Sequence, residues 1–130
     1  MANIPEDLHY SKDHEWVRVD GNVAIVGITD YAQDSLGDVV YVELPKPGEK
    51  FAANESFGSV ESVKAVSDLF APITGKVVKV NSPLADSPEY VNEDPYDEGW
   101  MIQVAVSNAK ELDALLDAEA YQAFLREQAE

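Results

Sequence analysis

The stretch GSVESVKAVSDLFAPITG, residues 58–75, contains one lysine, Lys64, between two runs of small and β-branched residues. Such runs are typical of β-strands, so the pattern predicts two short strands that meet in a turn at Lys64. Lys64 is the only basic residue of the stretch, and Glu61 and Asp68 flank it. A turn would leave its ε-amine accessible to a modifying enzyme, which makes Lys64 a candidate for covalent modification. The alternative is an ordinary solvated lysine on a turn.

The composition limits the kinds of protein this can be. A chain of 130 residues is long enough for one domain with its own core, so we expect a single domain over residues 1–130. It has no cysteine, which excludes disulfides, thiol nucleophiles and cysteine-ligated metals. Any thiol chemistry must therefore come from a cofactor or a partner.

The chain is rich in acidic residues and strongly negative. The formal net charge is −16, from 25 acidic and 9 basic residues. Such a field repels nucleic acid and anionic membrane surfaces, so neither is expected as a partner. It favours docking onto basic patches of other proteins, although the acid excess could also serve only solubility.

The first twenty residues carry acids and histidines. They contain no apolar core like that of a secretion signal and no arginine-rich pattern like that of a transit peptide. No apolar run approaches the roughly 18 residues of a membrane span. We therefore expect a soluble, cytoplasmic protein.

Several other segments predict β-structure. Residues 15–28 are rich in β-branched residues and are interrupted by Gly21-Asn22, which predicts a hairpin. Further strands are expected at residues 39–42 and 100–106. Gly37 and Gly75 are expected in turns. The fold class predicted from these segments is mainly β.

Two helical regions are expected. Thr29 or Asp30 can cap a short helix near residues 30–36, which Gly37 would end. Near the C-terminus, apolar residues recur at helical spacing over about residues 109–127. There, Asn108 and Glu111 form a capping-box-like pair, and Asp117 could cap a second helix. One bent helix and two short ones remain alternatives.

An internal repeat is also present. The segment 37–42 recurs as 75–80, and the same offset aligns residues 25–54 with residues 63–92. Two copies of a unit too small to bury its own apolar face predict two sheets stacked around a shared core with pseudo-twofold symmetry. On this alignment, Lys64 stands where the first copy has Val26.

The other residue types that often form functional sites fit no known motif here. His9 and His14 are the only histidines and fit no zinc-site spacing, so no metal site is expected and both are interpreted as surface residues of a turn or strand. Trp16 and Trp100 are expected in the core. No phosphate-binding loop or nucleophile motif is present. We therefore expect a protein that is not an enzyme.

The lysine stretch resembles a known family. Residues 61–68, ESVKAVSD, are similar to the lipoyl-attachment signature of the glycine cleavage system H proteins. Further blocks that resemble the family, in its order along the chain, are HEWV at 14–17, VGIT at 26–29, YAQ at 31–33, LGDV at 36–39, VELP at 42–45, APITG at 71–75, PY at 95–96 and GW at 99–100. Together they span nearly the whole chain.

The resemblance implies a fold and a cofactor. The implied fold is the barrel-sandwich hybrid of biotinyl and lipoyl carriers, with a C-terminal helical segment. Lys64 would bear lipoic acid through an amide, which would supply the sulfurs that the chain lacks. The residues implied in recognition of this lysine are Glu61, Ser62, Val63, Ala65 and Asp68.

The resemblance also implies partners. In the family's cycle, the P protein, a glycine decarboxylase, leaves an aminomethyl group on a lipoyl sulfur. The T protein, an aminomethyltransferase, takes this group, and the L protein, a dihydrolipoamide dehydrogenase, reoxidises the dithiol. A long tethered arm suits visits to several active sites. Lipoyl-attaching enzymes would be further partners of this carrier, which we expect to be a monomer.

The family shelters the loaded arm in a groove on the carrier. Glu15 and Asp68 match family acids near that groove, so the resemblance implies that they hydrogen-bond the loaded amine.

Three alternatives remain for Lys64. A biotinyl carrier usually has its lysine between methionines, whereas Val63 and Ala65 flank this one. A lipoyl domain of a 2-oxo acid dehydrogenase usually has Asp before the lysine and Ala/Pro-rich linkers beside it, and neither is found here. The third alternative is an interaction protein, which would keep Lys64 unmodified.

A further role is also open for a lipoyl carrier, since it could donate its lipoyl groups to 2-oxo acid dehydrogenases.

Overall fold

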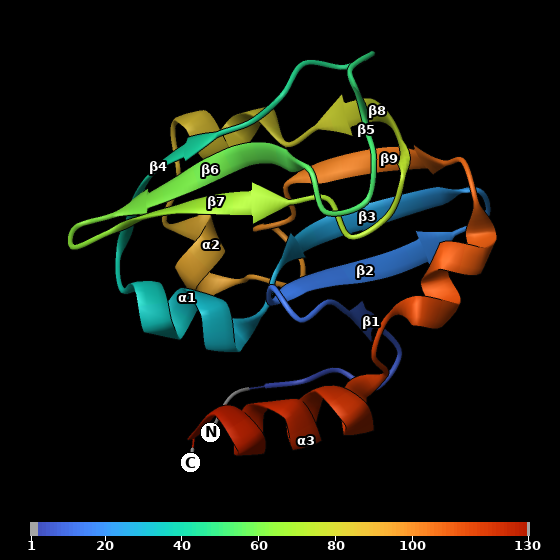
Figure 1. The fold of residues 1–130 in the computed structure, drawn as a ribbon. Helices are drawn as coiled ribbons and strands as arrows, with labels where there is room; N and C mark the ends of the chain where they lie inside the picture. The colour runs from blue at the N-terminus through green and yellow to red at the C-terminus, as the bar shows by residue number, and fades with distance from the viewer. Residues whose placement is uncertain (1–2, 130) are drawn as a thin grey trace.

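The computed structural model describes residues 3–129, in which two antiparallel sheets face each other (Figure 1). The larger sheet has six strands in the order β1 (His9–Tyr10), β2 (Glu15–Asp20), β3 (Val23–Ile28), β9 (Ile102–Val106), β8 (Gly75–Val80) and β5 (Lys50–Phe51). The smaller has the order β4 (Val39–Glu43), β6 (Ser56–Ser62) and β7 (Val66–Phe70). The helical segments are α1 (Asp30–Leu36), η1 (Ser82–Ala85), α2 (Tyr90–Glu93), η2 (Ala109–Ala114) and α3 (Ala118–Ala129). The prediction of a mainly β carrier fold is confirmed.

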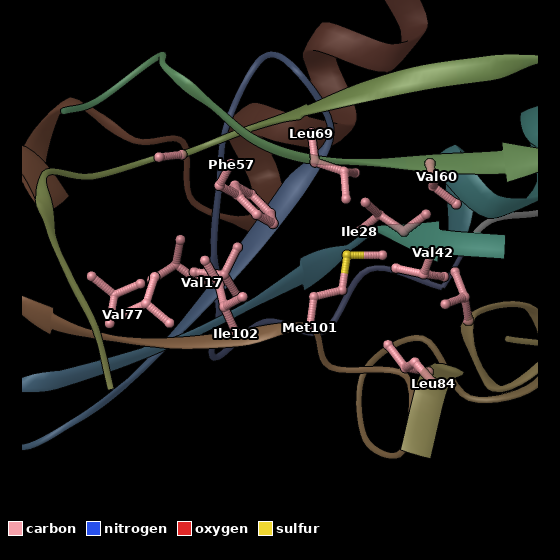
Figure 2. Close-up of a cluster of buried hydrophobic side chains, with 14 of the residues drawn as sticks. Val17, Ile28, Val42, Phe57, Val60, Leu69, Val77, Leu84, Met101 and Ile102 are labelled. Atoms are coloured by element: carbon pink, nitrogen blue, oxygen red, sulfur yellow. The ribbon is translucent and has the colours of Figure 1, made fainter. Parts of the chain in front are cut away.

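The core lies between the two sheets (Figure 2). Side chains at alternate positions of facing strands fill it, because successive side chains of a strand point to opposite faces. In Figure 2, Phe57 of the smaller sheet points toward Val17 of the larger one. Val60 of the smaller sheet points toward Ile28 of the larger one. This packing holds β6 and β7, and therefore the turn between them, against the larger sheet.

A second apolar cluster joins the larger sheet to α3, which lies beneath it in Figure 1. Its buried members are Leu8, Tyr10, Trp16, Tyr96, Ala118 and Tyr121. Trp16 is fully buried, as predicted, and its indole N–H donates to the carbonyl of Pro95 at 2.9 Å. Trp100 packs on the same cluster but stays partly exposed.

The predicted hairpin and first helix are confirmed. β2 pairs with β3 up to Asp20 and Val23, and Gly21 has a φ of 63° in the two-residue turn between them. Thr29 caps α1, because its side-chain oxygen accepts from the backbone N–H of Ala32. Gly37 ends the helix with a φ of 80°, a conformation that glycine adopts without steric cost.

The C-terminal segment consists of two separate helices. The first, η2, is a 3-10 helix, and Asp117 caps the second by accepting from the N–H of Ala120 at 2.8 Å. Asn108 caps η2 as predicted. The capping-box role of Glu111 is wrong, because its carboxylate instead accepts from the N–H and the hydroxyl of Thr74, at 2.6 and 2.8 Å.

Two further expectations are wrong in detail. Gly75 lies within β8, paired with Phe51 and Val106, and is not a turn residue. A Cβ there would lie 2.3 Å from the carbonyl oxygen of Ala105, so the close approach of β9 requires glycine. The last strand begins at Ile102 and not at Trp100.

The repeated segments 39–42 and 77–80 lie in β4 and β8, one strand in each sheet. Other aligned positions differ in structure, since Thr29-Asp30 starts α1 whereas Ser67-Asp68 lies within β7. The duplication of residues 25–54 as 63–92 stays a prediction.

Candidate functional site

Lys64 lies at the tip of the hairpin formed by β6 and β7, which projects beyond the sheets on the left of Figure 1. Its side chain is exposed, and so are those of its neighbours Val63 and Ala65. Val63 keeps 71% of its surface accessible, which is a high value for an apolar side chain. The hairpin therefore presents one ammonium group between exposed small and apolar side chains.

Ser62 holds the shape of this tip. Its hydroxyl oxygen accepts from the backbone N–H groups of Lys64 and Ala65, at 3.3 and 3.1 Å. Its own backbone N–H donates to the carbonyl of Ala65 at 2.8 Å. Ser62 is only 5% exposed, so its side chain supports the turn from inside. Val63 adds a bond from its N–H to the carbonyl of Asp38, at 3.1 Å, which ties the tip to the segment after α1.

The side chain of Lys64 runs close to Gly37. A Cβ at Gly37 would lie 3.4 Å from Cε of Lys64 and 3.9 Å from its Nζ. Asn92 of α2 fixes this part of the chain, since its amide donates to the carbonyl of Gly37 at 2.8 Å and its oxygen accepts from the N–H of Val39 at 2.8 Å. The sequence did not predict this role of Asn92, whose partners lie more than fifty positions away.

Glu61 and Asp68, predicted to surround the lysine, are both exposed. Glu61 lies in a cross-strand row between Tyr41 of β4 and Val66 of β7. Tyr41 and Val66 are also largely exposed, at 53% and 66%. The hairpin and the neighbouring strand β4 thus place the Glu61 carboxylate between two exposed side chains, Tyr41 and Val66, near the lysine.

A groove of about 310 Å³ lies beside the hairpin. It is formed by the turn before β2, the adjoining ends of β2 and β3, the helix α1, and the strands β6 and β7. Its lining residues are Asp13, His14, Glu15, Ile28, Tyr31, Ala32, Ser35, Leu36, Val60, Ser67, Asp68 and Leu69. The structure therefore brings Glu15 and Asp68, two acids far apart in the sequence, to one groove. Leu36 of the lining immediately precedes Gly37, against which Lys64 lies.

Glu15 is the buried acid of this groove, with 2% of its surface exposed. The hydroxyl of Ser11 donates to its Oε1 at 2.6 Å, and the N–H of Phe70 donates to its Oε2 at 3.3 Å. Burial outweighs these bonds and raises the pKa of the Glu15 carboxyl to about 8. At neutral pH the carboxyl is therefore mostly protonated, and it loses its proton as the pH rises through about 8.

His14 lies in a turn, as expected, but it is half-buried and not a fully exposed surface residue, and it lines the groove. His9 lies in β1 and is also only partly exposed. The φ of His14 is 69°, a conformation that is uncommon for residues other than glycine. Its Nδ1 lies 2.8 Å from the hydroxyl of Tyr121. Burial lowers the pKa of its imidazole. No local pattern predicts this contact, because the two residues lie 107 positions apart.

Residues 3–129 contain no group of three or more His, Cys, Asp or Glu side chains placed to hold a metal ion. None of the helices described has the length and apolar character needed to cross a membrane.

Comparisons with known proteins point to one family. Residues 8–128 match the family model described as Glycine cleavage H-protein. A Glycine cleavage system H protein of Symbiobacterium thermophilum is 62% identical over 127 residues, which are 98% of this chain and 99% of that protein. One of Carboxydothermus hydrogenoformans is 58% identical over 130 residues and covers both chains completely. The crystal structure of a glycine cleavage system H protein from Mycobacterium marinum superposes with a TM-score of 0.85 at 43% identity, over 92% of this chain and 97% of that one.

Proposed function

Because the chain belongs to the glycine cleavage H-protein family, we propose that Lys64 is the residue to which its lipoate is attached. The observation that carries this assignment is the place of Lys64, exposed at the tip of the β6–β7 hairpin with its stem against Gly37. An attaching enzyme needs an accessible amine on a defined turn. Lys64 offers both.

The protein is the lipoyl carrier of the glycine cleavage system and is not itself an enzyme. It works with the P, T and L proteins of that system, moving the aminomethyl group of glycine from the P protein to the T protein. When attached, the lipoyl group would supply a disulfide, which is reduced as one of its two sulfurs accepts the aminomethyl unit. The chain itself contributes the anchor, the surface around it and the groove.

The residues of the groove fit such an arm. Ile28, Leu36, Val60 and Leu69 give it an apolar lining suited to an acyl chain. β7 runs from the tip to Phe70, whose N–H donates to Glu15. From Ala65 of the turn to Phe70 there are five residue steps, which at about 3.3 Å each place Glu15 roughly 16 Å along the strand from the lysine turn. The groove thus lies along β7, between the lysine turn and a buried acid.

We propose that Glu15 and Asp68 receive the amine of the loaded arm. Both line the groove, Glu15 buried and Asp68 exposed at its rim. Glu15→Ala and Asp68→Ala are each expected to speed the loss of ammonia from the isolated loaded carrier, because the amine loses a hydrogen-bond partner. Measuring free ammonia over time tests this. Loss at the wild-type rate in both variants would refute the proposal.

Reconstitution with the P, T and L proteins tests the assignment of Lys64. Glycine-dependent NADH formation is expected to vanish in Lys64→Arg, because arginine keeps the charge but cannot form the lipoyl amide. Lys46→Arg is the matched control, since Lys46 is also an exposed lysine of a turn, and it should keep full activity. NADH formation that survives Lys64→Arg would overturn the assignment.

We also propose that the protein acts in the cytoplasm, where lipoyl-attaching enzymes would supply the arm. The support is its similarity to bacterial relatives and the need for partners that use NAD and tetrahydrofolate. Fractionation of the source cells, with detection of the lipoylated chain, tests this location.

A further inference from the structure

The hydroxyl of Tyr121 joins three segments that are distant in the sequence. Tyr121 lies on α3 and is fully buried, with its ring stacked on Tyr10 at a centroid distance of 4.7 Å. Its oxygen is 2.8 Å from Nδ1 of His14 and 2.8 Å from Oγ1 of Thr29. Neither of these two partners belongs to α3 or to its neighbours in the sequence.

The hydroxyl hydrogens of Thr29 and Tyr121 both find an acceptor among these three side chains in only one arrangement. Thr29 Oγ1 already accepts from the N–H of Ala32, so its own hydrogen is free to go to Tyr121. The Tyr121 hydroxyl then donates to Nδ1 of His14. This arrangement needs a neutral imidazole with its proton on Nε2. Burial lowers the pKa of His14, which favours that neutral form.

The two partners of Tyr121 belong to two walls of the groove. His14 lines the groove itself, beside Glu15. Thr29 caps α1, the helix whose residues Tyr31 and Leu36 form the facing wall. The two walls also meet directly, since the N–H of Thr29 donates to the carbonyl of His14 at 3.0 Å. A backbone with positive φ, as at His14, persists only where its surroundings hold it.

We propose that Tyr121 is a positioning residue of the groove, through which α3 fixes the His14 turn and the start of α1 relative to each other. This inference rests on the proposed function in one respect, namely that the groove receives the loaded arm. The C-terminal helix would then support the site although it does not line it. Removing only the hydroxyl should loosen the groove while the stacked ring and the core stay in place.

The first test uses the protein without lipoate. In Tyr121→Phe, nitrogen-edited NMR is expected to show that Nδ1 of His14 has lost its hydrogen bond and that the imidazole titrates at a higher pH than in the wild type. The other groups around His14 are Asp13 and Glu15 next to it, Tyr31 of α1 and Phe124 of α3, and the substitution changes none of them.

Tyr10→Phe is the matched control. It removes the hydroxyl of the other ring of the stacked pair, which donates to the carbonyl of Pro5 and touches neither His14 nor Thr29. We expect the His14 titration of this variant to equal that of the wild type.

A measurement on the wild-type protein alone also tests the inference. The Nε2–H tautomer of His14 is expected, and finding the Nδ1–H tautomer would overturn the inference even if Tyr121→Phe does not fold.

The second test uses the loaded carrier. Tyr121→Phe is expected to lose ammonia about two- to tenfold faster than the wild type, the range expected for the loss of one hydrogen bond, whereas Tyr10→Phe should not differ. An unchanged His14 titration together with unchanged ammonia loss would refute positioning by Tyr121, even if the thermal stability fell. Absence of lipoate from Lys64 would refute the proposed function instead, and the NMR result would be unaffected.

Discussion

Glu15 shows how burial sets the chemistry of one side chain. It is an acid held inside the protein by only two donors, Ser11 and Phe70. Removing a carboxylate from water costs more than two such hydrogen bonds return, so the protonated form is favoured in the folded state. A carboxyl that titrates near neutral pH can both donate to and accept from a bound amine.

The stability of the protein should depend on pH through Glu15. Folding raises the pKa of this carboxyl from 4.5 to about 8, so the folded state binds more protons in this window than the unfolded state. The free energy of unfolding should therefore fall as pH rises from about 4.5 to 8, by up to about 1.4 kcal/mol per pH unit. Glu15→Gln, which cannot ionise, should lack this contribution.

Chemical denaturation of both proteins across this pH range measures the difference. The two curves of unfolding free energy against pH should diverge toward pH 8, with the variant becoming relatively more stable. Parallel curves would show that Glu15 titrates alike in the folded and unfolded states.

Single residues differ in how far the sequence predicts them. Lys64 is recognisable because all its signals are local: one cation, small neighbours and a turn pattern. Glu15 and Asp68 could be assigned only through the family resemblance. Tyr121 falls within the helical spacing predicted over about residues 109–127, but its hydrogen bonds were not predicted, because they join it to residues 92 and 107 positions away.

At the scale of elements, the β6–β7 hairpin is the part that presents the lysine. Ser62 accepts two backbone N–H groups within its turn and is buried there. The resemblance placed Ser62 among residues recognised by partners. The hydrogen bonds of the structure give it, in addition, the task of shaping the turn that carries Lys64.

Ser62→Ala should therefore weaken the presentation of the lysine. Two N–H groups of the turn lose their acceptor, so the free energy of unfolding should fall by about 1–2 kcal/mol and lipoylation by a lipoyl-attaching enzyme should slow. Ser59→Ala on the same strand is the control, and it should match the wild type in both measurements. Wild-type lipoylation kinetics in Ser62→Ala would mean that its hydroxyl does not shape the substrate turn.

Elements with local signals were predicted well, and those set by distant contacts were not. The first hairpin and α1 follow from a two-residue turn, a cap at Thr29 and a glycine at the end of the helix. Glu111 resembled a capping residue in sequence, but Thr74 offers it two donors at once across the fold. Gly75 looked like a turn glycine because the close approach of Ala105 has no local signature.

At the scale of the whole molecule, the protein carries a net charge of −16, and one lysine, Lys64, lies at the tip of its β6–β7 hairpin. Exposed apolar side chains on the hairpin, such as Val63 and Val66, are the places where contacts can exclude water. The acidic surface acts over a longer range and should mainly speed the encounter with basic partner surfaces. The fold class followed from strand patterns and the family blocks, whereas the groove follows only from the packed structure.

The charge predicts a salt dependence. Raising the ionic strength from about 0.05 to 0.5 M should raise the KM of the P and T proteins for this carrier several-fold, because exposed charges are then screened. The kcat should change little, since the arm and groove are short-range features. Steady-state kinetics at each ionic strength with a fixed glycine concentration measure both values. A KM that is constant with salt would show that long-range charge has no part in docking.

The most direct test of the lipoyl carrier assignment is the mass of the chain itself. Wild-type protein incubated with lipoate, ATP and a lipoyl-attaching enzyme, then analysed intact and by peptide mapping, should gain the mass of one lipoyl amide, located on the peptide that contains Lys64. A chain that gains no lipoyl mass, or gains it on another lysine, would contradict the assignment of Lys64 as the anchor of the arm.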